Sequence, residues 1–131
     1  MVICVDFDGT IVDHRFPAIG NPVPGAIEWM KRLQKYGAKI ILFTMRSDSR
    51  PFGTTLADAR KYMQENGIEL YGVNENPTQS DWTTSPKVHA DIYVDDCAFG
   101  CPLIYPKGFN RPCVNWKEVG PELERMCLSK R

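Results

Sequence analysis

A chain of 131 residues is the size of one domain, so we expect a single domain over residues 1–131. Sixteen Lys and Arg residues balance sixteen Asp and Glu residues, and this zero formal net charge disfavours nucleic acid as a partner held by bulk charge. No apolar run reaches the roughly 18 residues that span a bilayer, which argues against a membrane partner.

The five cysteines predict a reducing compartment. Their number is odd, and no secretion signal precedes the first apolar strand, which begins at Val2. Because free thiols are the rule in the cytoplasm, we predict a cytoplasmic protein with reduced cysteines.

Continuous apolar segments predict the strands of the fold. They run over residues 2–7, 39–44 and 90–94, with shorter segments at 69–73 and 102–105. Strands that are apolar on both faces, rather than on alternate residues, are typical of a parallel sheet that is covered on both sides.

Helical patterns fill the gaps between these strands. The first helix follows Pro24, whose ring suits an initial helical position, and ends at Gly37. The second begins at Thr55 and Asp58, which have capping-box spacing, and a third covers residues 119–127. This alternation predicts a doubly wound α/β fold, a three-layer α/β/α sandwich with a mainly parallel sheet.

Acidic residues follow two of the predicted strands. Asp6 and Asp8 end the first strand, and Asp95 and Asp96 follow the strand over residues 90–94. In such folds, ligands bind beyond the carboxyl ends of the strands. Four carboxylates gathered there repel one another, and a hard divalent cation relieves the repulsion. We therefore predict a Mg²⁺ site formed by Asp6, Asp8, Asp95 and Asp96.

The same residues predict phosphoryl-transfer chemistry. A carboxylate beside a metal can attack phosphorus to form an aspartyl phosphate, and a second carboxylate can act as general acid and base. Thr44, at a strand end, and Lys87, ahead of the second acidic pair, offer donors for the phosphoryl oxygens. Arg46 offers a fork for an anionic group of the substrate. The predicted substrate-binding residues are Gly9, Thr10, Thr44, Met45, Arg46 and Lys87.

The order of these residues resembles the four motifs of the haloacid dehalogenase superfamily of phosphohydrolases. The residues that carry the resemblance are Asp6-Phe7-Asp8-Gly9-Thr10, Thr44, Lys87 and Asp95-Asp96. The resemblance implies Asp6 as nucleophile and metal ligand, and Asp8 as general acid and base. It implies that Thr44 and Lys87 bind the phosphoryl group, and that the late acidic pair completes the Mg²⁺ site. An acid at position 8 is similar to phosphatases rather than dehalogenases.

The whole sequence is also similar to small capless members of this superfamily from bacteria and phages. The room between the motifs leaves residues 11–23 for a flap, while the loops 46–54 and 74–86 are too short for a cap domain. We therefore expect an open site, roofed at most by loops or by a second subunit of a homo-oligomer. His14 lies in the flap, where we expect a solvated loop histidine.

The predicted function is a magnesium-dependent phosphatase that hydrolyses a phosphomonoester through an aspartyl phosphate. The alternatives are a phosphotransferase with the same intermediate and a non-catalytic phosphate-binding or regulatory protein. A phospho-receiver domain is disfavoured, because its acidic pair precedes its phosphorylated aspartate, the reverse of the order here. Nucleotides, sugar phosphates, polynucleotide ends and phosphoproteins all stay open as substrates.

Overall fold

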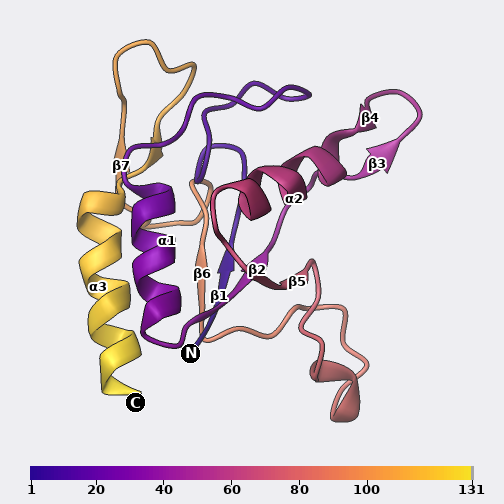
Figure 1. Cartoon of the computed structure of the whole chain (residues 1–131), viewed down its shortest axis with the longest axis vertical. Coiled ribbons are helices and arrows are strands. Elements are labelled where there is room, and N and C mark those ends of the chain that lie inside the picture. The colour runs from indigo at the N-terminus through magenta and orange to yellow at the C-terminus, as the bar shows by residue number, and fades with distance from the viewer. Residues whose placement is uncertain (131) are drawn as a thin grey trace.

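The computed structural model describes residues 1–130, so the predicted domain end at residue 131 lies outside the described residues. The main sheet contains β1 (Val2–Val5), β2 (Lys39–Leu42), β5 (Leu70–Val73) and β6 (Ile92–Val94). The helices are α1 (Ala26–Lys35), α2 (Thr55–Glu65), α3 (Trp116–Ser129) and the 3₁₀ helix η1 (Gln79–Asp81). Two short antiparallel pairs join β3 (Asp48–Ser49) to β4 (Gly53–Thr54) and β7 (Leu103–Ile104) to β8 (Cys113–Val114). Figure 1 shows their arrangement.

The main sheet is parallel throughout, with the strand order β5-β2-β1-β6. This confirms the predicted mixed α/β class, and the sheet is of the Rossmann-like kind. The register sets Val5 beside Leu42 on one side and beside Val94 on the other. Because the three strands run the same way, the residues that follow them meet at one edge of the sheet.

One face of the sheet packs on the α-helices. Ile3 and Val5 of β1 belong to a single large apolar cluster, which also contains Met30 of α1, Met63 of α2 and Leu123 of α3. All three α-helices therefore contribute buried side chains to the cluster on this face. Burial of this apolar area is the main term that holds the helices to the sheet.

The opposite face of the sheet has a smaller cover. Cys4 of β1 and Ile41 of β2 form a second cluster with Val88 and Ala90. These two covering residues come from the extended segment between η1 and β6, rather than from an α-helix. The sequence predicts helices on both faces of the sheet. Within residues 1–130, extended chain rather than an α-helix covers this second face.

The start of α2 is capped from outside the helix. The helix begins at Thr55, as predicted. However, Asp48 in β3 supplies the cap, because its Oδ1 accepts the backbone N–H groups of Leu56 at 3.1 Å and Ala57 at 3.0 Å. Asp58, the predicted capping-box partner, instead accepts the hydroxyl of Thr54 at 3.1 Å. The β3–β4 hairpin is thereby tied to the helix that it precedes.

The last helix begins at Trp116, three residues earlier than predicted. Trp116 is fully buried, and its Nε1 donates to the carbonyl of Thr10 at 2.7 Å, which connects α3 to the loop after β1. Along the helix, Gly120 allows a close approach to α1, because a Cβ atom there would overlap the ring of Trp29. Figure 1 shows α1 and α3 side by side.

Candidate active site

The carboxyl edge of the sheet brings the two predicted acidic groups together. The backbone N–H of Asp6 donates to the carbonyl of Val94 at 3.0 Å, which continues the register of β1 on β6. Thr10 then links both groups, because its Oγ1 donates to Asp6 Oδ2 and accepts the N–H of Asp96, each at 3.2 Å. Thr10, predicted to bind substrate, therefore positions Asp6 beside the residues that follow β6.

Burial and neighbouring acids raise the pKa of Asp6 and of Asp95. Burial is the largest cause that raises the pKa of Asp6, to about 8, and the nearby carboxylates of Asp95 and Asp96 raise it further. Burial also raises the pKa of Asp95, with a further contribution from Asp96. A positive charge in the cluster would reverse these electrostatic contributions.

The side chain of Asp96 is enclosed by the protein. Its side chain is 8% exposed, and its Oδ2 lies 2.9 Å from Nε2 of His14. Its Oδ1 is buried and has no hydrogen-bond partner among residues 1–130. A buried carboxylate oxygen without a donor is costly, so this atom calls for a ligand that the protein itself does not supply.

The carboxylates of Asp95 and Asp96 offer the hard oxygen ligands that a divalent cation such as Mg²⁺ prefers. One potential ligand atom from each of Asp95, Asp96 and Cys97 lies within 4.8 Å of the others. The charge of Asp96 raises the pKa of the Cys97 thiol, and a protonated thiol is a poor ligand. The carboxylates are therefore the ligands of choice, and the unpartnered oxygen of Asp96 is the atom that a cation would satisfy.

Gly9 creates the space in which this cluster lies. Its φ of 87° is in the left-handed region, and a Cβ atom at this position would overlap Asp96 Oδ2 and His14 Nε2. Its own backbone is committed to the fold, since its N–H donates to Val12 at 2.7 Å and its carbonyl accepts the N–H of Val114 at 3.0 Å. Gly9 therefore shapes the site without offering its amide to a substrate.

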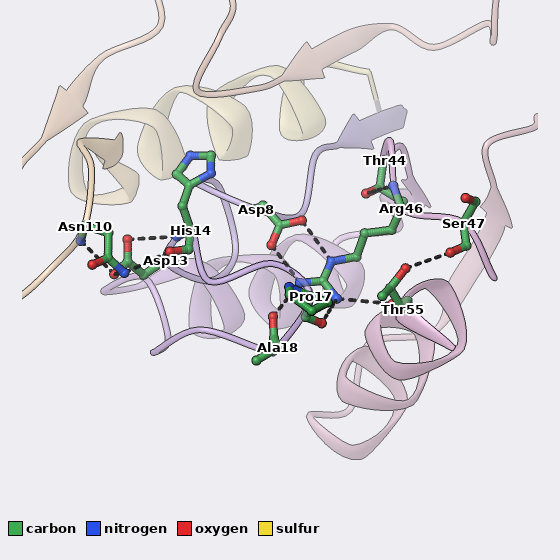
Figure 2. Close-up of polar contacts among 10 residues, drawn as sticks. All are labelled: Asp8, Asp13, His14, Pro17, Ala18, Thr44, Arg46, Ser47, Thr55 and Asn110. Atoms are coloured by element: carbon green, nitrogen blue, oxygen red, sulfur yellow. Dashed lines mark hydrogen bonds and ion pairs between the residues drawn. The ribbon is translucent and has the colours of Figure 1, made fainter. Parts of the chain in front are cut away.

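Asp8 lies in a different setting, because Arg46 occupies both of its carboxylate oxygens. Arg46 Nε donates to Asp8 Oδ2 and Nη2 donates to Oδ1, each at 2.8 Å. The same guanidinium donates to the carbonyls of Pro17 at 3.2 Å, Ala18 at 2.7 Å and Thr55 at 3.2 Å (Figure 2). Arg46 is 3% exposed. Its guanidinium thus binds the protein rather than a substrate, and both oxygens of the Asp8 carboxylate are already paired.

The remaining predicted donors also have partners of their own. Thr44 accepts the N–H of Arg46 on its Oγ1 at 3.1 Å, and its own N–H donates to Asn74 Oδ1 at 2.8 Å. The side chain of Met45 is 96% exposed. Thr44 therefore lies at the carboxyl edge of the sheet in contact with Arg46, and the side chain of Met45 points into solvent.

Lys87 is not brought to Asp6 in this arrangement. It lies on the exposed segment that covers the second face of the sheet, and its Nζ is 6.0 Å from the centre of the Tyr93 ring. Among residues 1–130, the ion pairs of Asp6 and its neighbours do not include Lys87. The predicted contact between Lys87 and the nucleophile would need a movement of this long side chain.

Two residues that the sequence analysis missed hold the flap in place. Asp13 is buried, and its Oδ2 accepts the backbone N–H of Asn110 at 2.9 Å and the side-chain amide at 3.1 Å. Asn110 also donates through Nδ2 to the carbonyl of His14 at 2.8 Å. A buried acid five residues after Asp8 is the only trace of this contact in the sequence, because its partner is far along the chain.

His14 differs from the solvated loop histidine that we expected. Its side chain is 19% exposed and its Nε2 contacts Asp96. Figure 2 shows the imidazole pointing away from the Asp13–Asn110 pair that fixes its backbone. The flap thus contributes a nitrogen atom to the edge of the acidic cluster.

The parallel sheet and the carboxylates at its edge define a Rossmann-like α/β protein with a candidate metal site. A solved structure of a conserved protein from Bacteroides thetaiotaomicron is 31% identical in sequence and covers 96% of this chain and 91% of its own, with a TM-score of 0.73. The chain belongs to the same family as this conserved protein. No protein-family model matches the chain, and no curated protein matches it. Every helix within residues 1–130 lacks the length and apolar character that crossing a membrane requires.

Proposed function

We propose that the protein is a magnesium-dependent phosphatase of the haloacid dehalogenase type, which hydrolyses a phosphomonoester through an aspartyl phosphate on Asp6. The cluster of Asp6, Asp95 and Asp96 at the ends of two parallel strands carries the proposal. Within it, Asp96 Oδ1 is buried without a donor, and burial and neighbouring charges raise the pKa of Asp6 to about 8. Such an arrangement lowers the stability of the fold, and it is expected where a bound cation offsets that loss during catalysis.

The fold that belongs to this proposal is a three-layer sandwich without a cap domain, in which extended chain before β6 forms most of the third layer. The flap and the β3–β4 hairpin supply a small roof. Their rings Phe16 and Phe52 meet at a centroid distance of 5.1 Å, and both stay about half exposed. A roof of this size supports an open site that accepts substrates larger than the crevice.

In the proposed reaction, Asp6 attacks phosphorus. A bond forms between its carboxylate oxygen and phosphorus while the bond to the leaving alcohol breaks, and water then attacks phosphorus to release phosphate and restore Asp6. Mg²⁺ held by Asp6, Asp95 and Asp96 supplies positive charge that favours ionised Asp6 and offsets the charge of the phosphoryl oxygens. Thr10 holds the carboxylate of Asp6 in place through its 3.2 Å hydrogen bond.

The proton transfers are assigned to Asp8, which gives a proton to the leaving alcohol and later takes one from water. This role requires Asp8 to release Arg46. Arg46 can stay in place when this happens, because it keeps the carbonyls of Pro17, Ala18 and Thr55 as partners. Thr44 and Lys87 are assigned to the phosphoryl oxygens, and Lys87 would leave the Tyr93 ring to reach them.

Turnover of p-nitrophenyl phosphate with Mg²⁺ and with a chelator tests the proposal. We expect activity with Mg²⁺, none with the chelator, and a phosphorylated Asp6 peptide after rapid acid quenching. Asp6→Asn should abolish both signals, whereas the control Asp81→Asn, at an exposed acid in η1, should keep them. Full turnover in the chelator, or in Asp6→Asn, would overturn the mechanism.

A non-catalytic phosphate-binding protein is the second candidate. It is favoured by the pairing of Asp8 with Arg46 and by the position of Lys87, whose Nζ lies over the Tyr93 ring and, within residues 1–130, forms no ion pair with the acidic cluster. Calorimetric binding of inorganic phosphate in the presence of Mg²⁺, together with no turnover of a panel of phosphomonoesters, would establish this candidate over the phosphatase.

A further inference from the structure

We propose that Asp95, Asp96 and Cys97 form a binding site for a thiophilic divalent ion such as Zn²⁺, which competes with Mg²⁺ for the two carboxylates. The inference rests on the cation site of the proposed function, and it adds an inhibitory ion to that site. The ligand that distinguishes the two ions is a thiol, which lies outside the residues from which the Mg²⁺ site was predicted.

The first observation is the grouping of three ligand atoms. One carboxylate oxygen from each of Asp95 and Asp96 and the Sγ of Cys97 lie within 4.8 Å of one another. Ligands of a tetrahedral zinc ion lie about 3.6 Å apart, given Zn–O bonds of about 2.1 Å and Zn–S bonds of about 2.3 Å. The three atoms are therefore close enough to share one ion, with its fourth position open to water.

The second observation is independent of the thiol. The side chain of Asp96 is 8% exposed, and its Oδ1 is buried without a hydrogen-bond partner among residues 1–130. Its other oxygen, Oδ2, is already paired with His14. The Asp96 carboxylate also lies within hydrogen-bonding reach of Asp95, a contact that raises the pKa of Asp95. Two acids in contact, one of them with a buried oxygen left over, are satisfied by a shared cation.

The third observation is the accessibility of Cys97. Among the five cysteines it is the exposed one, whereas Cys101 is half-buried and the other three are buried. The backbone N–H of Cys97 donates to Asp95 Oδ1 at 2.8 Å, which holds the thiol in the turn that carries both acids. An ion that arrives from solvent therefore meets this thiol and the carboxylates together.

The chemistry of these three donors suits a softer ion than Mg²⁺. Mg²⁺ prefers six oxygen ligands, and the thiol of Cys97 adds nothing to its binding. Zn²⁺ accepts mixed sulfur and oxygen ligands in four-coordinate sites. As the Zn–S bond forms, the thiol proton leaves to solvent and the sulfur electron pair binds the ion, with no change of oxidation state. Bound Zn²⁺ then occupies the carboxylates that Mg²⁺ requires.

Co²⁺ is the probe for this site, because it replaces Zn²⁺ and shows a near-ultraviolet charge-transfer band when a thiolate binds it. The wild type, Cys97→Ser and Asp95→Asn are titrated with Co²⁺ after full reduction and without a histidine tag. Cys101→Ser is the matched control, since this thiol lies four residues away in the same loop. Zn²⁺ is then added to displace Co²⁺, and its effect on p-nitrophenyl phosphate turnover with Mg²⁺ is measured.

We expect the band in the wild type and in Cys101→Ser, and its loss in Cys97→Ser. Asp95→Asn should weaken Co²⁺ binding by at least the roughly 10-fold that loss of a supporting contact costs a metal site. Zn²⁺ should remove the band in the wild type and slow the alkylation of Cys97, as read by mass spectrometry. Inhibition of turnover, relative to each protein's own rate without Zn²⁺, should require about 10-fold more Zn²⁺ in Cys97→Ser.

The outcomes separate this inference from the proposed function. A band that persists in Cys97→Ser, or Co²⁺ that binds the wild type without a band, would overturn the inference and leave the phosphatase intact. Equal Co²⁺ affinity in the wild type and Asp95→Asn would show a lone thiol and overturn it as well. A band that depends on Cys97, without any turnover, supports the inference and contradicts the phosphatase. The alkylation measurement uses the wild type alone, so it decides the question if a variant does not fold.

Discussion

Two groups of carboxylates follow the carboxyl ends of β1 and β6, and the protein surrounds them differently. Asp8 and Asp13 each accept hydrogen bonds on both oxygens, from Arg46 in one case and from the backbone N–H of His14 and from Asn110 in the other. Asp96 has a buried oxygen without any partner within residues 1–130. Acids of one chemical type thus divide into satisfied and unsatisfied groups within a few residues of sequence.

The difference separates acids that stabilise the fold from acids that burden it. The satisfied acids join the flap to the loops around it and add to the free energy of unfolding. The unsatisfied cluster around Asp6 lowers that free energy, because burial and like charges disfavour its ionised form. Groups that reduce stability in this way are expected at sites kept for ligands or chemistry.

The largest expected effect comes from neutralising Asp6. Asp6→Asn should reduce phosphate release by more than about 10⁴-fold, since the attacking carboxylate is lost. The same change should leave the Tm at pH 8 equal or higher, because it removes a charge that the fold disfavours. Phosphate release and thermal unfolding measured on one preparation check both statements. A large drop in Tm would show that Asp6 stabilises the fold as Asp8 and Asp13 do, and would contradict the distinction between the two groups of acids.

Arg46→Ala should produce the largest loss of stability. It leaves Asp8 without its partner and frees the carbonyls that the guanidinium binds, so we expect the free energy of unfolding in urea to fall by about 3 kcal/mol. The control Arg50→Ala, at an exposed site in the hairpin, should change it by less than about 0.5 kcal/mol. Similar small losses in both variants would show that the Asp8–Arg46 pair is dispensable.

The acidic cluster should make stability depend on pH and on cations. The folded pKa of Asp6, about 8, lies above its ordinary value of 3.8, so its contribution is fully present below about pH 4 and is lost as the pH rises through 8. The difference in Tm between the wild type and Asp6→Asn isolates this contribution. Added Mg²⁺ should raise the wild-type Tm by a few degrees at pH 9 and by less at pH 6. A gain that is equal at both pH values would contradict this.

Asn110→Ala should have the smallest effect of the four. It removes the two side-chain donations to Asp13 and His14 but keeps the backbone N–H to Asp13. We expect a loss of about 1 kcal/mol in urea unfolding and faster amide exchange in the flap. Asn21→Ala, at an exposed position of the same flap, is the control and should show neither change.

The sequence was informative where the structure depends on local pattern. Continuous apolar segments located the four parallel strands, although the segment at 102–105 forms β7 of a separate antiparallel pair. The acids at the strand ends located the edge at which Asp6 meets Asp96. Parallel strands place their carboxyl ends together, so these positions follow from chain order and strand direction alone.

The other features depend on contacts between distant residues. Asp8 and Arg46 are 38 positions apart, and Asp13 and Asn110 are 97 apart, so no local period indicates either pair. The same holds for Asp48, which caps α2 from a neighbouring strand. The direction of a side chain could not be predicted from the sequence either. Lys87 is an example, because its Nζ lies over the ring of Tyr93.

The way in which Arg46 fastens the flap bears on how this family can diversify. The guanidinium binds the flap through the carbonyls of Pro17 and Ala18, which every amino acid possesses. Replacement of Ala18 by another small residue therefore preserves the attachment, whereas a change of Arg46 removes it. Selection can thus act on the exposed face of the flap, including Phe16, while its path over the crevice stays constant. Related chains that keep the arginine can therefore vary the exposed side chains of the flap without losing its attachment.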